Sequence, residues 1–269
     1  MQEHAIRFEN INMTFRAKRK EVAALRDISL EVGRHTFTSI VGPSGCGKST
    51  LLSLCAGLKF PSSGRTYCDG QAVEAVNTDI GFVTQDSNLF PWMTLRENVE
   101  FPLRVRGLPA RDRRARAQSQ IDMVGLSGFE DHYPHQLSGG MQKRASIIRT
   151  LVYEPDVILM DEPFGALDAQ TKMVLQDELL RMWSARKQTI LFVTHDLTEA
   201  VALSDQVVVM SGRPGQIKGV FDVNLQRPRD VFQIHGQEGF ARSYQQVWDC
   251  FRSELLAPEA PASVTEISA

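Results

Sequence analysis

The sequence predicts an α/β fold built around a parallel β-sheet, and three observations lead to this prediction. Short apolar runs rich in β-branched residues recur along the chain, as buried parallel strands do. Segments with helical periodicity separate these runs, which is typical of alternating strands and helices. A polar or glycine-rich turn follows each run, and sheets of this class bind their ligands beyond the carboxyl ends of their strands. We therefore expect the functional residues to lie along one edge of one sheet.

Five apolar runs are expected to form the strands of this sheet. In chain order they span residues 36–41, 80–83, 157–160, 190–193 and 207–210. Helical periodicity is seen in residues 50–58 and 170–185.

Two other regions break the alternation. Residues from about 87 to 140 are richer in Pro, Arg and helix formers, which indicates a helical insertion. Residues 231–269 are expected to form a C-terminal tail that is helical or frayed.

Bulk composition limits the possible functions. The chain has 269 residues, 42% of them hydrophobic, which is enough for a sizeable core. Its formal charge of -2 lacks the basic bias of nucleic-acid-binding proteins, so no nucleic-acid partner is expected. We expect no signal peptide, and no apolar stretch approaches the roughly 18 to 20 residues that span a bilayer. If the protein works at a membrane, a partner must therefore recruit it there.

The four cysteines show no C-x-x-C pair and no nearby His at metal-ligand spacing. We expect isolated, reduced thiols rather than a disulfide framework or a zinc site. They are Cys46, Cys55, Cys68 and Cys250.

A phosphate-binding loop (P-loop) follows the first of these runs. It fits the pattern G-x-x-x-x-G-K-[ST] between a strand and a helix, where glycines let backbone N–H groups approach phosphate oxygens. Lys48 is expected to neutralise the β- and γ-phosphates, and the Ser49 hydroxyl to ligate Mg²⁺. Cys46 lies near a helix N-terminus, which predicts a lowered thiol pKa and loss of ATP binding on alkylation. The loop consists of Gly42, Pro43, Ser44, Gly45, Cys46, Gly47, Lys48, Ser49 and Thr50.

Two carboxylates end the 157–160 run. Asp161 is suited to hold Mg²⁺ through water, as a Walker B aspartate does. Glu162 follows directly and is expected to act as general base on the attacking water. Strands often end in acidic turns that have only a structural role. The catalytic interpretation of Asp161 and Glu162 therefore depends on the P-loop upstream.

A capped helix start precedes this strand. Ser138 is predicted as the N-cap of a helix over Gly139–Leu151, and Gly139 and Gly140 open its first turn. Such a start is an anion site by the same physics as the P-loop, although the bare pattern fits an ordinary capped helix as well.

The motifs together resemble the nucleotide-binding subunit of ABC transporters over about residues 5–230. Leu-Ser-Gly-Gly-Met-Gln at 137–142 precedes Asp-Glu-Pro-Phe-Gly-Ala-Leu-Asp at 161–168, and Thr-His-Asp at 194–196 ends a later strand. This resemblance implies a P-loop NTPase fold with a RecA-like parallel core. It also implies a small antiparallel β region near 5–35 and 60–80, and a helical subdomain near 87–150.

The resemblance also implies roles for individual residues in an ATP-sandwich dimer with a second copy of the chain. Ser138, Gly139 and Gly140 would contact the γ-phosphate of ATP held by the other copy's P-loop. His195 would be the switch histidine, and Ala166, Leu167 and Asp168 would form the D-loop. Gln85 would sense nucleotide and the membrane partner, and would join Ser49 and Asp161 at Mg²⁺. Phe15, beside the basic loop at residues 16–20, lies where the family stacks an aromatic ring on adenine, although it fits a core residue too.

Further segments resemble ATPases of importers for nitrate, sulfonates and taurine. These are residues 88–94 after Gln85, residues 213–217 and residues 227–230. The helix after Ser138 departs from the pattern, with Arg-Ala-Ser-Ile-Ile-Arg-Thr at 144–150 where relatives more often have Ala-Arg-Ala near its end. The resemblance implies permease partners, a solute-binding protein that acts indirectly, and a peripheral position on the cytoplasmic face of the membrane. An exporter or lipoprotein-release ATPase and a soluble ABC ATPase of DNA repair or translation remain as alternatives.

Overall fold

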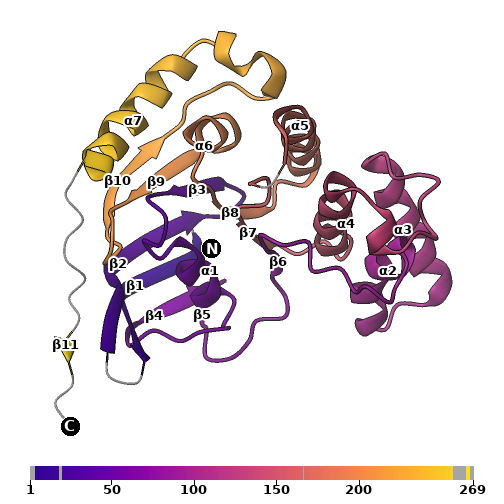
Figure 1. The fold of residues 1–269 in the computed structure, drawn as a ribbon, viewed down its shortest axis with the longest axis horizontal. Helices are drawn as coiled ribbons and strands as arrows, with labels where there is room; N and C mark the ends of the chain where they lie inside the picture. Colours follow the sequence, from indigo (N-terminus) through magenta and orange to yellow (C-terminus); the bar gives the residue numbers. More distant parts are fainter. Residues whose placement is uncertain (1–3, 18–19, 166, 257–264, 267–269) are drawn as a thin grey trace.

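The computed structural model describes residues 4–17, 20–165, 167–256 and 265–266. Two β-sheets lie on either side of the first helix, further helices cover the larger sheet, and three helices form a separate lobe (Figure 1). This arrangement agrees with the predicted α/β fold with an antiparallel region and a helical insertion.

The larger sheet has six strands in the order β10-β9-β3-β8-β7-β6. The strands β6, β7, β8, β3 and β9 pair in parallel, and β10 joins the edge antiparallel to β9. The five predicted strands are confirmed, with ends that differ by one residue. Their bounds are β3 Phe37–Val41, β6 Gly81–Val83, β7 Val157–Asp161, β8 Thr189–Val193, β9 Gln206–Met210 and β10 Ile217–Asp222.

The smaller sheet is antiparallel throughout, in the order β11-β2-β1-β4-β5. It is built mostly by two long N-terminal strands that pair along almost their whole length. The bounds are β1 His4–Ala17, β2 Lys20–Gly33, β4 Ser63–Cys68, β5 Gln71–Ala72 and β11 Thr265–Glu266.

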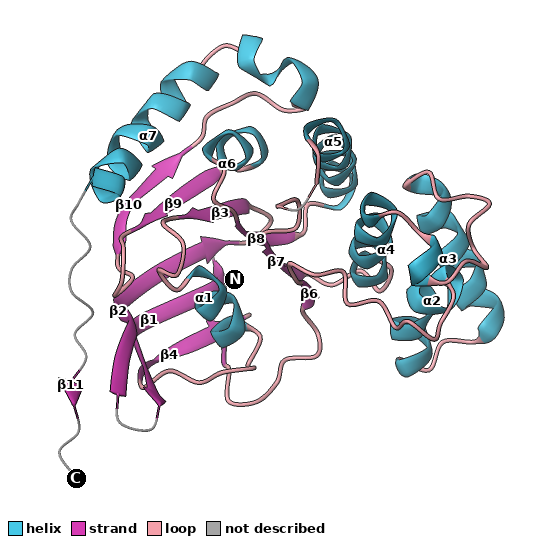
Figure 2. Ribbon diagram, viewed as in Figure 1, coloured by secondary structure: helices cyan, strands magenta, loops and turns pink. Residues whose placement is uncertain are grey.

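Helix α1 (Lys48–Cys55) packs between the two sheets, against β4 on one side and β7 and β8 on the other. The opposite face of the large sheet is covered by α6 (Leu197–Leu203) and by α7 (Phe240–Leu256), which contact β9 (Figure 2). α5 (Ala169–Arg186) lies at the β7 end of this layer. Helix α1, which follows the P-loop, is therefore packed on two sides, by the small sheet and by the large sheet.

The helical lobe consists of α2 (Leu95–Val105), α3 (Ala110–Met123) and α4 (Gly139–Leu151). It has an apolar cluster of its own, which includes Leu95, Val99 and Ile121. The helix predicted to follow Ser138 begins and ends at the expected residues. Two short 3₁₀ helices, Pro134–Gln136 and Val231–Gly236, lie before α4 and before α7. In the described part of the chain, no helix is both long and apolar enough to cross a membrane.

Candidate nucleotide site

A cleft of about 420 Å³ lies beyond the carboxyl ends of the parallel strands. It brings together residues from β1 and β2 of the small sheet, the P-loop, the segment after β6 and the segment after β7. Half of the residues predicted for nucleotide binding are found there. The lining residues are Phe15, Val22, Ala24, Ser44, Gly45, Gly47, Lys48, Ser49, Thr50, Gln85, Glu162 and Arg213.

The conformation of the P-loop depends on two of its glycines. Gly45 has φ +74° and Gly47 has φ +106°, in the left-handed region that other residues rarely adopt. A Cβ atom at Gly47 would also lie 2.5 Å from Leu25 Cδ2. Only glycine at this position lets the loop turn tightly into α1.

Lys48 lies inside the curve of this loop. Its Nζ donates to the carbonyl oxygens of Gly42, at 2.8 Å, and Pro43, at 3.0 Å. The N-cap residue Gly47 offers no side chain to the first turn of α1, so the N–H groups there are left for an external acceptor. A buried cation, free N–H groups and the positive end of a helix suit a polyphosphate.

Two oxygen ligands lie next to this loop. Ser49 Oγ donates to Asp161 Oδ1 at 2.8 Å, which joins the start of α1 to the end of β7. Burial raises the pKa of Asp161, and the hydrogen bond from Ser49 and the charge of Lys48 oppose this shift. A hydroxyl and a partly buried carboxylate are ligands that Mg²⁺ accepts, so these residues fit the predicted ion.

Glu162 lines the cleft, and His195, which is not among the lining residues, contacts its carboxylate. Glu162 is the first residue after β7, and His195 is the second residue after β8. Glu162 Oε2 lies 3.0 Å from Nδ1 of His195. Glu162 has φ +42°, and its backbone N–H donates to Val193 O at 2.9 Å. The left-handed backbone turns the carboxylate out of the strand direction and toward the histidine.

Gln85 follows β6 and is tied to the helical lobe by a residue that the sequence motifs did not identify. Lys143 of α4 is buried, and its Nζ donates to the carbonyl oxygens of Thr84, at 2.7 Å, and Gln85, at 2.9 Å. Burial lowers the pKa of Lys143 to about 8. In the sequence, the sign of this contact was a lysine on the face of the predicted helix that is buried.

Ser138 caps α4, and its side chain accepts a hydrogen bond from Met141 N at 3.3 Å. It lines a second cleft of about 420 Å³, which shares no lining residue with the first. Asp168 lies in this second cleft as the N-cap of α5, and hydrogen bonding by Thr171 lowers the pKa of its carboxyl. The second cleft is lined by Ser138, Gly139, Gly140, Met141, Arg144, Leu167, Asp168 and Thr171. One chain therefore does not bring the 138–140 motif to its own P-loop.

Phe15 is partly buried and forms a wall of the first cleft. Lys59 Nζ lies 4.7 Å from the centroid of its ring, and Lys59 does not line the cleft. Three predicted residues lie outside the described part of the chain. They are Ala166 of the predicted D-loop and Lys18 and Arg19 of the basic loop.

The predicted lowering of the Cys46 thiol pKa was wrong. Its side chain is only 1% exposed, and burial raises the pKa of the thiol despite the opposing charge of Lys48. The sulfur lies beneath the loop, where desolvation outweighs the helix N-terminus that the sequence prediction relied on.

Arg213 also lines the cleft and was not among the predicted site residues. Its Nη2 donates to Gly45 O at 3.2 Å. Gly215 holds this segment against the loop, because a Cβ atom there would lie 2.0 Å from Cys46 O. The segment was noted in the sequence only for its resemblance to importer ATPases.

Comparisons with known proteins point to one family. Residues 25–165 match the model of the ABC transporter family. An uncharacterized ABC transporter ATP-binding protein of Methanocaldococcus jannaschii is 50% identical over 251 residues, which is 93% of this chain and 92% of the relative. A nitrate import ATP-binding protein of Synechocystis sp. is 46% identical, over 80% of this chain and 81% of its own length.

Two more similarities extend this picture. An aliphatic sulfonates import ATP-binding protein of Bacillus cereus is 40% identical, over 87% of this chain and 92% of its own length. A solved dimeric ATP-binding cassette in a post-hydrolysis state, bound to ADP and phosphate, has a TM-score of 0.74 and 32% identity. That comparison covers 81% of this chain and 99% of the cassette.

Proposed function

Because the chain belongs to the ABC transporter family of ATP-binding proteins, we propose that it is the ATPase subunit of an importer for a small anionic solute. It binds ATP, and its ATPase activity serves transport. The proposal concerns the direction of transport, the class of solute, the partners and the role of each residue.

The separation of the two clefts carries the proposal of a head-to-tail dimer. The P-loop cleft and the cleft at Ser138 share no residue, yet both present helix N-termini that suit phosphate. A two-fold axis would place the Ser138 cleft of each copy over the P-loop of the other and so make two equal sites. The dimeric state of the similar solved cassette supports this arrangement.

Within each site, the residues of this chain would bind and orient nucleotide and water. Lys48 and the N–H groups at the start of α1 would hold the β- and γ-phosphates, and Phe15 would stack on the base. Ser49 and Asp161 would hold Mg²⁺, with Gln85 at the edge of the site, and Mg²⁺ neutralises phosphate charge when bound.

Glu162 would accept the proton of the attacking water at its carboxylate. His195, at 3.0 Å, would hold this carboxylate in place and contact the γ-phosphate. Ser138, Gly139 and Gly140 of the second copy would close the site from the other side and exclude water.

An aromatic surface on the helical lobe supports a permease partner. Trp92 is 69% exposed, and its ring centroid lies 5.6 Å from that of Phe90. Asn98 fixes the segment, since its Oδ1 accepts from Phe90 N at 2.8 Å and its Nδ2 donates to the carbonyl of Met93 at 3.0 Å. Aromatic residues held on a rigid segment are typical of protein interfaces. Docking there would bring the chain to the cytoplasmic face of the membrane as a peripheral subunit.

The relatives named for nitrate and for aliphatic sulfonates support import of a small anion. The test is to purify the chain from detergent-solubilised membranes of its own source and identify what remains bound. A multi-span permease, together with a solute-binding protein encoded or captured with it, supports the importer proposal. A permease of an exporter or lipoprotein-release system, or only soluble partners, contradicts it and leaves the ATPase intact.

A further inference from the structure

A network of polar side chains holds the segment that carries His195. This residue lies between β8 and α6, with Thr194 before it and Asp196 after it. Both of these neighbours make hydrogen bonds within the network, and a lysine of α5 joins it as a cation. The members are Thr194, Asp196 and Glu199 near the start of α6 and Lys172 and Gln176 of α5.

Glu199 is the centre of the network and is buried, with 4% of its surface exposed. Its Oε1 accepts from Lys172 Nζ at 2.9 Å, and its Oε2 accepts from the Thr194 hydroxyl. The Thr194 side-chain oxygen accepts in turn from the backbone N–H of Asp196 at 3.0 Å. The residues on both sides of His195 are therefore tied to one buried carboxylate.

Lys172 supplies the positive charge of the network. Its Nζ donates to Asp196 Oδ2 at 2.7 Å as well as to Glu199. Burial opposes the charge of Lys172, but the hydrogen bonds and charges of the two carboxylates outweigh burial and raise its pKa. Among the described residues, Lys172 is the only cation in an ion pair with either carboxylate. Without it both would lose their counter-charge, and Glu199 is too buried to be solvated.

The contact between His195 and Glu162 depends on where this segment lies. The side chain of His195 is 57% exposed, and Nδ1 lies 3.0 Å from Glu162 Oε2. Within the described part of the chain, this is the only hydrogen bond of the His195 ring. The position of the ring is therefore set by its backbone and not by packing around it.

We propose that Lys172 is a positioning residue for ATP hydrolysis. Its two ion pairs fix the His195 segment, and this segment presents the imidazole to Glu162. The inference rests on the roles proposed above for His195 and Glu162. Lys172 lines neither the P-loop cleft nor the Ser138 cleft, so it acts through His195 and does not touch the nucleotide.

The ATPase rate and the ATP affinity of Lys172→Met separate positioning from binding. Methionine keeps most of the length of the side chain and removes the ammonium group. We expect kcat to fall by about 10- to 100-fold, as displacements of about 1 Å do, while ATP affinity stays unchanged. Lys172→Arg keeps the charge and should restore most of the rate, and Lys172→Gln should lie between the two. Unchanged kcat in Lys172→Met, or an equal loss of ATP affinity, would overturn the proposal.

A control on the same helix shows whether any lost ion pair lowers the rate. Arg186→Met removes another cation of α5, which pairs with Glu154 at 2.7 Å on the surface. We expect this variant to hydrolyse ATP at the normal rate. If its kcat falls as far as that of Lys172→Met, the effect belongs to α5 as a whole and the proposal is wrong.

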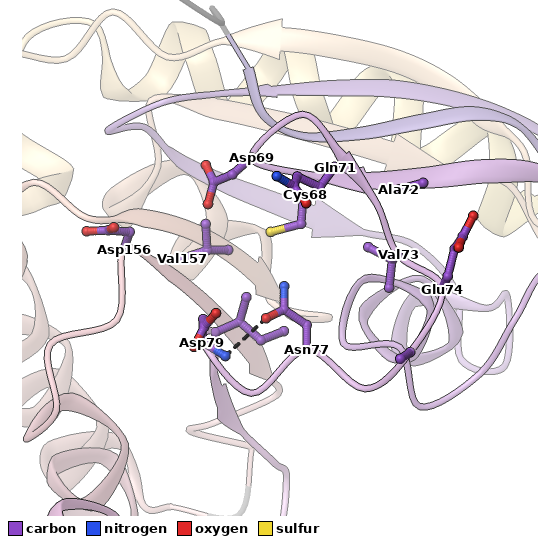
Figure 3. A pocket seen from close by; sticks show the side chains of 12 residues that line it. Cys68, Asp69, Gln71, Ala72, Val73, Glu74, Asn77, Asp79, Asp156 and Val157 are labelled. Atoms are coloured by element: carbon purple, nitrogen blue, oxygen red, sulfur yellow. Dashed lines mark hydrogen bonds between the residues drawn. The ribbon is translucent and has the colours of Figure 1, made fainter. Parts of the chain in front are cut away.

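A second control separates lost stability from lost position. Asn77 lines a cavity of about 560 Å³ beside Val157, the first residue of β7, and this cavity shares no lining residue with the nucleotide cleft (Figure 3). Its Oδ1 accepts from Asp79 N at 3.0 Å, so Asn77→Ala should lower the unfolding temperature and keep the normal rate. All rates are compared at a temperature at which each variant is folded.

The imidazole NMR signal of His195 reports the position of the ring directly, and His195→Gln assigns it by its loss. We expect the signal to shift in Lys172→Met and to stay in place in Lys172→Arg and Arg186→Met. A signal that stays in place while turnover is lost would overturn the proposal. If His195→Gln is inactive and Lys172→Met is not, only this inference fails. If His195→Gln hydrolyses ATP normally, the proposed role of His195 fails with it.

Discussion

Glu162 Oε2 lies 3.0 Å from His195 Nδ1, which joins the segment after β7 to the segment after β8. The two residues are 33 positions apart in the chain and meet because their strands are neighbours in a parallel register. Glu162 adopts φ +42° to make this contact, a conformation that a non-glycine residue rarely takes. Strained backbone of this kind is often found at functional sites.

Glu162→Gln should retain ATP affinity and lose nearly all turnover. The amide keeps the shape of the side chain and removes the proton acceptor, and a general base contributes about 10²–10⁴-fold in rate. Steady-state hydrolysis and ATP affinity, measured on the same preparation, check this. Glu178→Gln, a change of the same chemistry on α5, is the control and should hydrolyse ATP at the normal rate. Normal turnover in Glu162→Gln would remove this residue from the role of base.

Phe15→Ala should weaken binding of ATP and leave binding of inorganic tripolyphosphate unchanged. Stacking of a base on an aromatic ring contributes about 1–3 kcal/mol, and tripolyphosphate has no base to stack. Calorimetric titration of both ligands measures the difference. If both ligands bind more weakly, Phe15 supports the P-loop rather than the base, as a core residue would.

Glu178→Gln should raise the free energy of unfolding at pH 7 and change it little at pH 4. Burial raises the pKa of Glu178 despite the charges of Arg144 and Arg181. A carboxyl whose pKa is raised on folding contributes stability below its unfolded pKa, and this contribution is lost as the pH rises through the folded pKa. Among the described residues, Glu178 Oε2 is buried without a hydrogen-bond partner, so ionisation there is unfavourable.

Urea unfolding at the two pH values measures this effect. Asp177→Asn is the matched control, because Asp177 makes an ion pair with Arg181 at 2.7 Å and the variant should lose stability at pH 7. If Glu178→Gln changes the free energy of unfolding equally at both pH values, the pKa of the Glu178 carboxyl is not raised on folding.

The strands, the P-loop and the capped helix could be predicted because each depends on local chemistry. Ser138 caps α4 in the structure because its hydroxyl meets the free N–H groups of the first turn, as the sequence indicated. Gly47 adopts φ +106° at the turn into α1, a local conformation that favours glycine.

The contacts that the sequence did not predict join distant parts of the chain. Lys143 reaches the carbonyl of Gln85 from the helical lobe, and Arg213 reaches Gly45 from the segment after β9. The error at Cys46 has the same cause, since its burial depends on how Gly215 and the loop pack together. No spacing within a motif reports such packing.

A further prediction concerns two variants, one that disables the P-loop cleft and one that disables the Ser138 cleft. Lys48→Ala removes the ammonium that we propose binds phosphate, so it should lose ATP binding and turnover. Gly139→Asp adds a negative charge to the second cleft, and a Cβ atom there meets no described atom within 4 Å, so the variant should fold normally and lose turnover. Each variant alone is expected to be inactive because both sites of its dimer carry the change.

The most direct test of the head-to-tail site is the ATPase rate of an equal mixture of Lys48→Ala and Gly139→Asp. In the proposed dimer each site takes its P-loop and its Ser138 cleft from different copies. One site of a mixed dimer would then carry both changes and the other neither. Random pairing then leaves about a quarter of all sites intact, so the mixture should regain up to about a quarter of the unmodified rate. A mixture as inactive as its two components would contradict a site shared between two copies.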